Sequence, residues 1–287
     1  MMLQSQPIVH HPFAYGVGPL QFTGFGFAVL LAFVIAQIIG QRELARRGHD
    51  PEPIGDLIFA AVVGGLLGGK TYYVILTGDP SAFLSRAGLV FWGGLIGGTI
   101  AVLAMAKWRG MNLARVADVG GPAVMAAYAV GRTGCWAVGD DYGLPWDGPL
   151  AVAFPQGAPP STAGIMSQLF GVSFPPGTLP TEVIAVHPTQ LYQVTLATLF
   201  FLVLWRLRDH RHAEGWLFGV YCVLAGVERF VVEFFRAKDD RFFGMLTMAQ
   251  LFAIAFMVLG AAIMAARWNV RGRASGIYAP SRAPARA

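Results

Sequence analysis

The side chains of this sequence that could do chemistry are charges within long apolar stretches. Arg132 lies late in one such stretch, and Arg229 and Glu233 lie four residues apart in another. That spacing places Arg229 and Glu233 on one face of a helix, where they can form an ion pair. A charge in the hydrocarbon of a bilayer costs roughly 3 kcal/mol on insertion scales, so each of these residues requires a structural or functional reason.

Positive charge exceeds negative charge among these residues. Arg132, Arg229 and a third cation, Lys70, outnumber Glu233. A guanidinium donates two parallel hydrogen bonds to phosphate oxygens, and lipid head groups are the abundant anions at a membrane surface. The residues therefore predict a lipid-phosphate site. The simpler alternative is a structural Arg229–Glu233 pair, with Arg132 extending its charge to the interface.

His187, Gln190 and Tyr192 stand at the start of a further apolar stretch and border these charges. His187 is either a proton acceptor or a hydrogen-bonded structural residue. The sequence contains no HExxH, no Cys–His cluster at zinc spacing, no phosphate loop and no GxSxG. We therefore expect neither a metal nor a cofactor.

Helices across a membrane must position these side chains. Of the 287 residues, 55% are hydrophobic and 13% are charged, whereas about 25% are charged in ordinary soluble domains. A hydrocarbon core about 30 Å thick needs roughly 20 apolar residues per helix. The sequence predicts an all-α polytopic integral membrane protein, with a transmembrane domain over 1–266. Its seven spans are expected near 18–40, 54–76, 88–106, 117–138, 188–205, 216–235 and 246–266.

The basic residues predict the orientation of the chain. Most lie in one set of connecting segments and after residue 266, whereas the opposite set holds Arg86, Arg236, Lys238 and Arg241. The positive-inside rule then places the N-terminus outside and the C-terminus in the cytoplasm. The proline-rich segment 139–187 becomes a small extracytoplasmic lobe, and 267–287 a cytoplasmic tail. The net charge of +5 follows topology, so no nucleic-acid partner is expected.

Two glycine clusters fall within predicted spans. They comprise Gly64, Gly65, Gly68 and Gly69, and Gly93, Gly94, Gly97 and Gly98. Doubled small-xxx-small patterns let helix backbones approach closely, so we favour packing over a direct part in chemistry.

Several segments, in order along the chain, resemble motifs of bacterial prolipoprotein diacylglyceryl transferases. Residues 91–98, FWGGLIGG, resemble HGGLIG; 131–143, GRTGCWAVGDDYG, resemble GRxGNFxNxExxG. Residues 187–193, HPTQLYQ, are similar to HPSQLYE, and 229–236, RFVVEFFR, to RFxxEFxR; Gly68–Lys70 with Tyr73 are similar to GGRxxY. These similarities span most of the chain, from about residue 18 to 266.

The resemblance implies an enzyme of the bacterial inner membrane. It would move the diacylglyceryl group of phosphatidylglycerol to the lipobox cysteine of a prolipoprotein and release glycerol phosphate. The candidate catalytic residues are Arg132, Asp140, His187, Arg229 and Glu233. The candidate substrate-binding residues are Lys70, Trp92, Gly93, Gly94, Cys135, Gly143, Gln190, Tyr192 and Arg236.

The sequence departs from these motifs mainly where a proton acceptor is expected. Trp92 replaces the motif histidine, Cys135 and Val138 replace asparagines, Asp140 replaces a glutamate, and Gln193 replaces the glutamate that ends HPSQLYE. A tyrosine expected near the start of the first span is Thr23. His187, Asp140 or Asp141 could accept the thiol proton instead. The alternatives to this transferase are a related transferase with another acceptor, a phospholipid-binding membrane protein without transfer activity and, last, a transporter.

Overall fold

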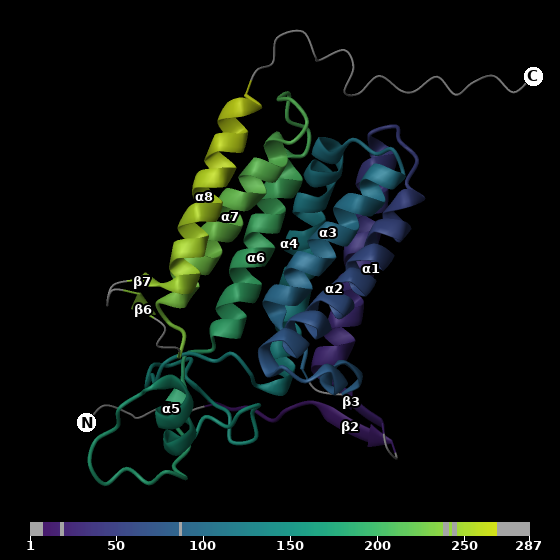
Figure 1. The fold of residues 1–287 in the computed structure, drawn as a ribbon. Helices are drawn as coiled ribbons and strands as arrows, with labels where there is room; N and C mark the ends of the chain where they lie inside the picture. The colour runs from purple at the N-terminus through teal and green to yellow at the C-terminus, as the bar shows by residue number, and fades with distance from the viewer. Residues whose placement is uncertain (1–7, 18–19, 86–87, 238–240, 243–245, 269–287) are drawn as a thin grey trace, which may run out of the picture.

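Seven long helices form one bundle in the described part of the computed structural model (Figure 1). The structure describes residues 8–17, 20–85, 88–237, 241–242 and 246–268. The long helices are α1 (Gly24–Arg46), α2 (Pro53–Thr77), α3 (Phe91–Trp108), α4 (Leu113–Val138), α6 (Thr189–Leu207), α7 (Trp216–Glu233) and α8 (Met248–Ala266). They correspond to the seven predicted spans, so the all-α membrane architecture is confirmed.

Six of these helices are long and apolar enough to cross a membrane within the part of the chain that the structure describes. The remaining long helix, α7, contains Glu228, Arg229 and Glu233 among its 18 residues. Charge at this density belongs inside a bundle, and α7 packs against α4, α6 and α8. The bundle thus covers the charged helix with apolar ones.

The lobe, residues 139–187, lies at the same end of the bundle as the described N-terminal residues (Figure 1). It contains β4 (Val152–Ala153), α5 (Ala163–Phe170) and β5 (Ala185–Val186). The N-terminal strand β1 (Ile8–Val9) pairs with β4, which joins segments far apart in the sequence. We call this end the lobe end; α8 terminates at the opposite end. The predicted tail lies outside the described residues from 269 onward.

The first predicted span began too early. Strand β3 (Leu20–Thr23) pairs with β2 (Ala14–Val17) in a hairpin, and α1 begins only at Gly24. The Thr23 hydroxyl accepts a hydrogen bond from the Gly26 amide at 3.2 Å and so caps the helix. Apolar residues in the hairpin made its sequence resemble an extension of the helix. The remaining short elements are η1 (Pro80–Leu84) and the pair β6 (Arg241–Phe242) and β7 (Leu246–Thr247).

The glycine clusters pack α2 directly against α3. A Cβ on Gly68 would lie 2.3 Å from the carbonyl oxygen of Gly93, and a Cβ on Gly64 would lie 2.6 Å from that of Gly97. Gly94 faces the carbonyl oxygen of Gly65, with its own Cβ position 3.4 Å away. The expectation that these glycines serve packing agrees with this geometry.

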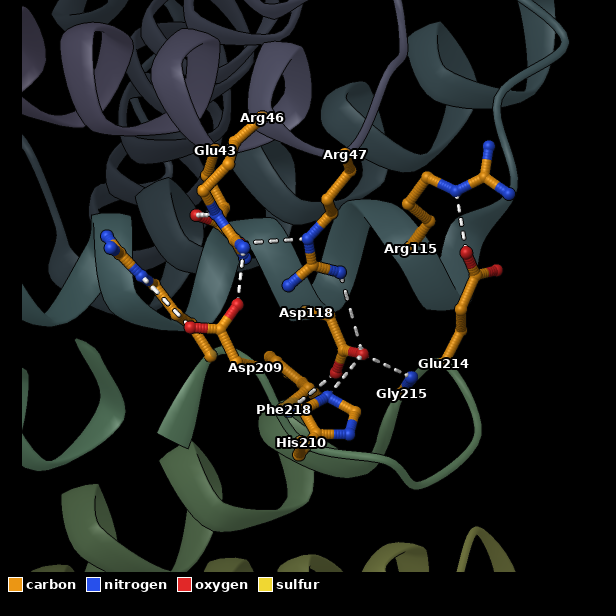
Figure 2. A network of polar contacts seen from close by, with 11 residues as sticks. Glu43, Arg46, Arg47, Arg115, Asp118, Asp209, His210, Glu214, Gly215 and Phe218 are labelled. Carbon is orange, nitrogen blue, oxygen red and sulfur yellow. Dashed lines mark hydrogen bonds and ion pairs between the residues drawn. The ribbon is translucent and has the colours of Figure 1, made fainter. Parts of the chain in front are cut away.

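A polar network lies where α4 begins, at the end of the bundle opposite the lobe, and Figure 2 shows it from close by. The fully buried Asp118 on α4 accepts hydrogen bonds from the amides of Gly215 at 2.8 Å and Phe218 at 3.0 Å. These amides belong to the first turn of α7, whose donors have no intrahelical partners. Arg47 Nη1 and His210 Nε2 lie 4.0 and 3.4 Å from the same carboxylate. Asp118 therefore ties the start of α7 to the end of α1.

Candidate active site

The candidate site begins where α4 ends at the lobe end. Gly139 adopts φ 70° and terminates the helix, and Asp141 follows with φ 56°, unusual for a residue with a side chain. Two side chains from the start of α6 hold this turn. Gln190 Nε2 donates to the carbonyl of Asp140, and Thr189 Oγ1 donates to that of Asp141, both at 2.6 Å. The Gln190 amide thus fixes the loop that presents both aspartates, and its part in substrate binding stays a prediction.

Asp141 joins two arginines that are far apart in the sequence. Its Oδ2 accepts a hydrogen bond from Arg132 Nη1 at 2.6 Å, and its Oδ1 accepts one from Arg236 Nη2 at 2.8 Å. Partial burial would raise the pKa of Asp141, but the charges of Arg236 and Arg132 outweigh it and lower that pKa to about 2. Asp141 is therefore an anion at neutral pH.

Glu233 continues the chain of ion pairs on α7. Its Oε2 lies 2.8 Å from Arg229 Nη2 and 3.6 Å from Arg236 Nε. The Glu233 side chain is fully buried, whereas 28% of Arg229 remains exposed. The ion pair predicted from the i,i+4 spacing is present, and Arg229, Glu233, Arg236, Asp141 and Arg132 form one continuous array. We call these five residues the arginine array.

The charge balance of the array differs from the sequence expectation. Three guanidiniums face two carboxylates in the array. The excess of positive charge is therefore smaller than expected from the sequence, which suggested Arg132, Arg229 and Lys70 around a single glutamate. The second carboxylate is Asp141, and the third cation is Arg236. The Lys70 ammonium instead donates to the carbonyl of Ser85, beyond α2, at 2.5 Å. A part for Lys70 in substrate binding stays a prediction.

Asp140 and Cys135 lie beside Arg132. One ligand-type atom from each of Cys135, Asp140 and Asp141 lies within 4.8 Å of the others. Arg132 Nη1 donates to both Cys135 Sγ, at 3.3 Å, and Asp141, so a guanidinium already provides the positive charge there. Partial burial raises the pKa of Asp140 to about 6. Asp140 can therefore exchange a proton near neutral pH.

His187 belongs to an aromatic cluster next to the array. Its ring stacks on Trp146 with centroids 4.5 Å apart, and its Nδ1 lies 3.1 Å from the Tyr192 hydroxyl. Partial burial lowers its pKa, which keeps the ring neutral at pH 7. The Gly143 amide donates to the carbonyl of His187 at 2.8 Å, and a Cβ on Gly143 would lie 2.3 Å from the carbonyl oxygen of Phe235. Gly143 thus lets the lobe pack tightly on the ends of α6 and α7.

Trp92 lies at the start of α3. Its ring contacts Phe252 of α8, with centroids 4.9 Å apart, and 43% of the residue is exposed. An indole has no basic nitrogen, so Trp92 cannot replace the motif histidine as a proton acceptor. A contact between Trp92 and a substrate remains a prediction, as it does for Gly93 and Gly94.

Four polar residues around the array had no role predicted from the sequence. They are Tyr128, Thr189, Gln193 and Glu228. Tyr128 stands four residues before Arg132, a spacing that places both on one helix face and could have identified it. The contacts of Thr189 and Gln193 cross between helices, and no local spacing reveals them.

Fold and site together define a polytopic helical membrane protein with an arginine–carboxylate array at one end of its bundle. The family model for prolipoprotein diacylglyceryl transferase matches residues 12–266, and the chain belongs to this family. A phosphatidylglycerol–prolipoprotein diacylglyceryl transferase of Paraburkholderia phymatum is 30% identical over 293 residues, which cover 92% of this chain and 95% of the relative. One of Vibrio vulnificus is 30% identical over 269 residues, covering 88% and 90%. One of Nitratidesulfovibrio vulgaris is 29% identical over 264 residues, covering 87% and 91%.

Proposed function

We propose that this protein transfers the diacylglyceryl group of phosphatidylglycerol to the lipobox cysteine of prolipoproteins in the bacterial inner membrane. The observation that supports this most directly is the arginine array. It places partly exposed guanidiniums at one end of a membrane bundle, where a lipid phosphate can reach them. Family membership supplies the reaction, and the array supplies the groups that the reaction needs.

The reaction exchanges one bond at the glycerol carbon of the diacylglyceryl group. The acceptor thiol loses its proton to a base, and the sulfur forms a thioether bond to that carbon. The bond from the carbon to the phosphate oxygen breaks, and its electron pair leaves with glycerol phosphate. Negative charge therefore grows on the phosphate as the bond breaks, and positive groups held in place beforehand stabilise it.

Residues of the array and two of its neighbours act on the substrates in this proposal. Arg132 and Arg229 bind the phosphate and stabilise the leaving glycerol phosphate. Glu233, buried between Arg229 and Arg236, orients both guanidiniums. Asp140 takes the thiol proton, because its pKa of about 6 leaves it mostly ionised yet basic at neutral pH. His187 is the competing proton acceptor.

The lobe end faces the extracytoplasmic side in this proposal, with the N-terminus outside. The excess of basic residues at the opposite end supports that orientation. Glycerol phosphate would then leave into water from the outer leaflet, while the lipidated product stays in the membrane.

The direct test is a mass measurement on the acceptor. Purified protein in phosphatidylglycerol nanodiscs is incubated with a prolipoprotein peptide that contains a lipobox cysteine. A mass gain equal to one diacylglyceryl group supports the proposal, and Arg132→Ala and Arg229→Ala should each abolish it. Asp147→Asn, in an exposed part of the lobe, is the control.

The substitutions at Trp92 and Gln193 favour one alternative, a phospholipid-binding protein without transfer activity. That alternative predicts no mass gain from folded wild-type protein, together with phosphatidylglycerol binding that weakens in Arg132→Ala. Mass gain with a different thiol or amine acceptor only would instead indicate a related transferase.

A further inference from the structure

A buried carboxylate outside the arginine array lies on α7, beside Arg229. Glu228 is 3% exposed and points away from Glu233, toward α4. Both of its oxygens lie near the Tyr128 hydroxyl, at 3.3 and 3.4 Å. Burying a carboxylate inside a membrane bundle costs free energy, so Glu228 requires a structural or functional reason.

The Tyr128 hydroxyl connects three helices. It accepts hydrogen bonds from Arg132 Nε at 3.2 Å and Gln193 Nε2 at 2.7 Å. A hydroxyl has one proton and two lone pairs, so its proton remains for Glu228. The Arg132 guanidinium also lies over the Tyr128 ring, 5.4 Å from the centroid. All three bonding positions of the hydroxyl are occupied, which fixes the ring and the guanidinium above it.

This arrangement holds Arg132 at Nε, whereas Nη1 points toward the partly exposed face of the site. Nε is bonded to Tyr128, while Nη1 turns toward Asp141 and Cys135 at the partly exposed face. A guanidinium fixed at Nε has lost the freedom to swing away from the phosphate. Small errors in the placement of such a group lower the rate of the chemical step.

Gln193 bonds to the same Tyr128 hydroxyl and differs from the motif residue at its position. It is fully buried and stands where the motif HPSQLYE has a glutamate. Its amide and the Glu228 carboxylate bind the same hydroxyl from α6 and α7. In this chain the carboxylate that contacts the Tyr128 hydroxyl thus comes from α7, and α6 contributes a neutral amide.

We propose that Glu228 is a positioning residue: acting through the Tyr128 hydroxyl, it fixes Arg132 for the leaving phosphate and replaces the carboxylate that the motif has at position 193. This inference rests on the proposed transfer reaction. It concerns the geometry of Arg132, and Glu228 itself touches neither substrate.

The test compares Glu228→Gln, Tyr128→Phe, their double variant and Gln193→Glu/Glu228→Gln in the peptide transfer assay. Glu228→Gln should lower kcat about tenfold or more and leave KM for phosphatidylglycerol within about twofold, because placement affects the chemical step more than binding. Glu228→Gln should add nothing in the Tyr128→Phe background, since the effect passes through that hydroxyl. Returning the carboxylate to α6 should restore most of kcat.

Glu214→Gln, which breaks an ion pair with Arg115 at the opposite end, is the matched control, and unfolding midpoints are measured for every variant. Wild-type kcat in Glu228→Gln, or a loss that Gln193→Glu fails to restore in a folded protein, would overturn the inference while the transfer reaction stands. An inactive wild-type protein would overturn the proposed function and this inference with it.

Discussion

Asp141 bridges Arg132 and Arg236, with Oδ2 2.6 Å from one guanidinium and Oδ1 2.8 Å from the other. The carboxylate therefore uses the Nη atoms that a phosphate would need, and it is ionised at neutral pH. In the proposed function, Asp141 and the lipid phosphate therefore compete for Arg132.

Replacing Asp141 by Asn should tighten the binding of glycerol phosphate by about fivefold, because a competing, partly exposed charge pair contributes up to about 1 kcal/mol. The unfolding midpoint should fall, because both arginines lose an ionic partner. Isothermal titration of the detergent-solubilised protein measures the affinity, with Asp147→Asn as control. Weaker binding in Asp141→Asn would show instead that this carboxylate prepares the arginines for phosphate.

The raised pKa of Asp140 predicts how stability depends on pH. Between pH 3.8 and about 6 the folded state keeps a proton that the unfolded state has released. The contribution of Asp140 to stability should therefore fall as pH rises through this window and stay constant above it. Asp141, whose pKa is lowered, acts in the opposite sense, but below pH 3.8. Asp140→Asn should remove the fall, which unfolding midpoints between pH 4 and 7 would reveal.

Transfer activity should change with pH in the opposite direction. Only ionised Asp140 can accept the thiol proton, so the rate should rise with pH through about 6. Asp140→Asn should lose this inflection and roughly 100-fold or more of the rate. His187→Gln provides the comparison: if it loses the inflection and Asp140→Asn keeps it, His187 is the proton acceptor.

The sequence predicted those features that depend on local spacing. Apolar runs of membrane-spanning length predicted seven helices, and four-residue spacing predicted the Arg229–Glu233 pair. The bridge from Asp141 to Arg236 was not predictable in this way. It needs a left-handed residue after α4, and its partner lies 95 positions away in the sequence.

The strands of the N-terminal region were also not predictable from local sequence. Strand β1 pairs with β4 across more than half of the chain, and most residues of hairpin β2–β3 are apolar or aromatic, as in α1. Composition distinguishes a helix from a strand poorly in such short segments. Gln193 was missed for another reason, because its contact with Tyr128 crosses from α6 to α4 and local spacing does not reveal it.

Two glycine substitutions, one in the α2–α3 contact and one outside it, should have opposite effects on the free energy of unfolding. In Gly68→Ala the new Cβ would lie 2.3 Å from the Gly93 carbonyl oxygen, so the helices must separate, at a cost of about 1–3 kcal/mol. A Cβ on Gly120 of α4 would have nothing within 4 Å, so Gly120→Ala should stabilise by about 0.5–1 kcal/mol. Unfolding titrations in mixed micelles compare the two. Equal effects would contradict close backbone packing between α2 and α3.

The polar network at the end opposite the lobe predicts a loss of stability without a loss of chemistry (Figure 2). Asp118→Asn removes the charge that faces Arg47 and His210 and weakens the cap on α7. Breaking a buried charge cluster from one side costs roughly 3–5 kcal/mol. Asp56→Asn, which breaks a partly exposed pair with Arg109, should cost under about 1 kcal/mol. Because the arginine array lies at the other end, transfer activity per folded molecule should match the wild type in both variants. A drop confined to Asp118→Asn would show that the start of α7 controls the placement of Arg229.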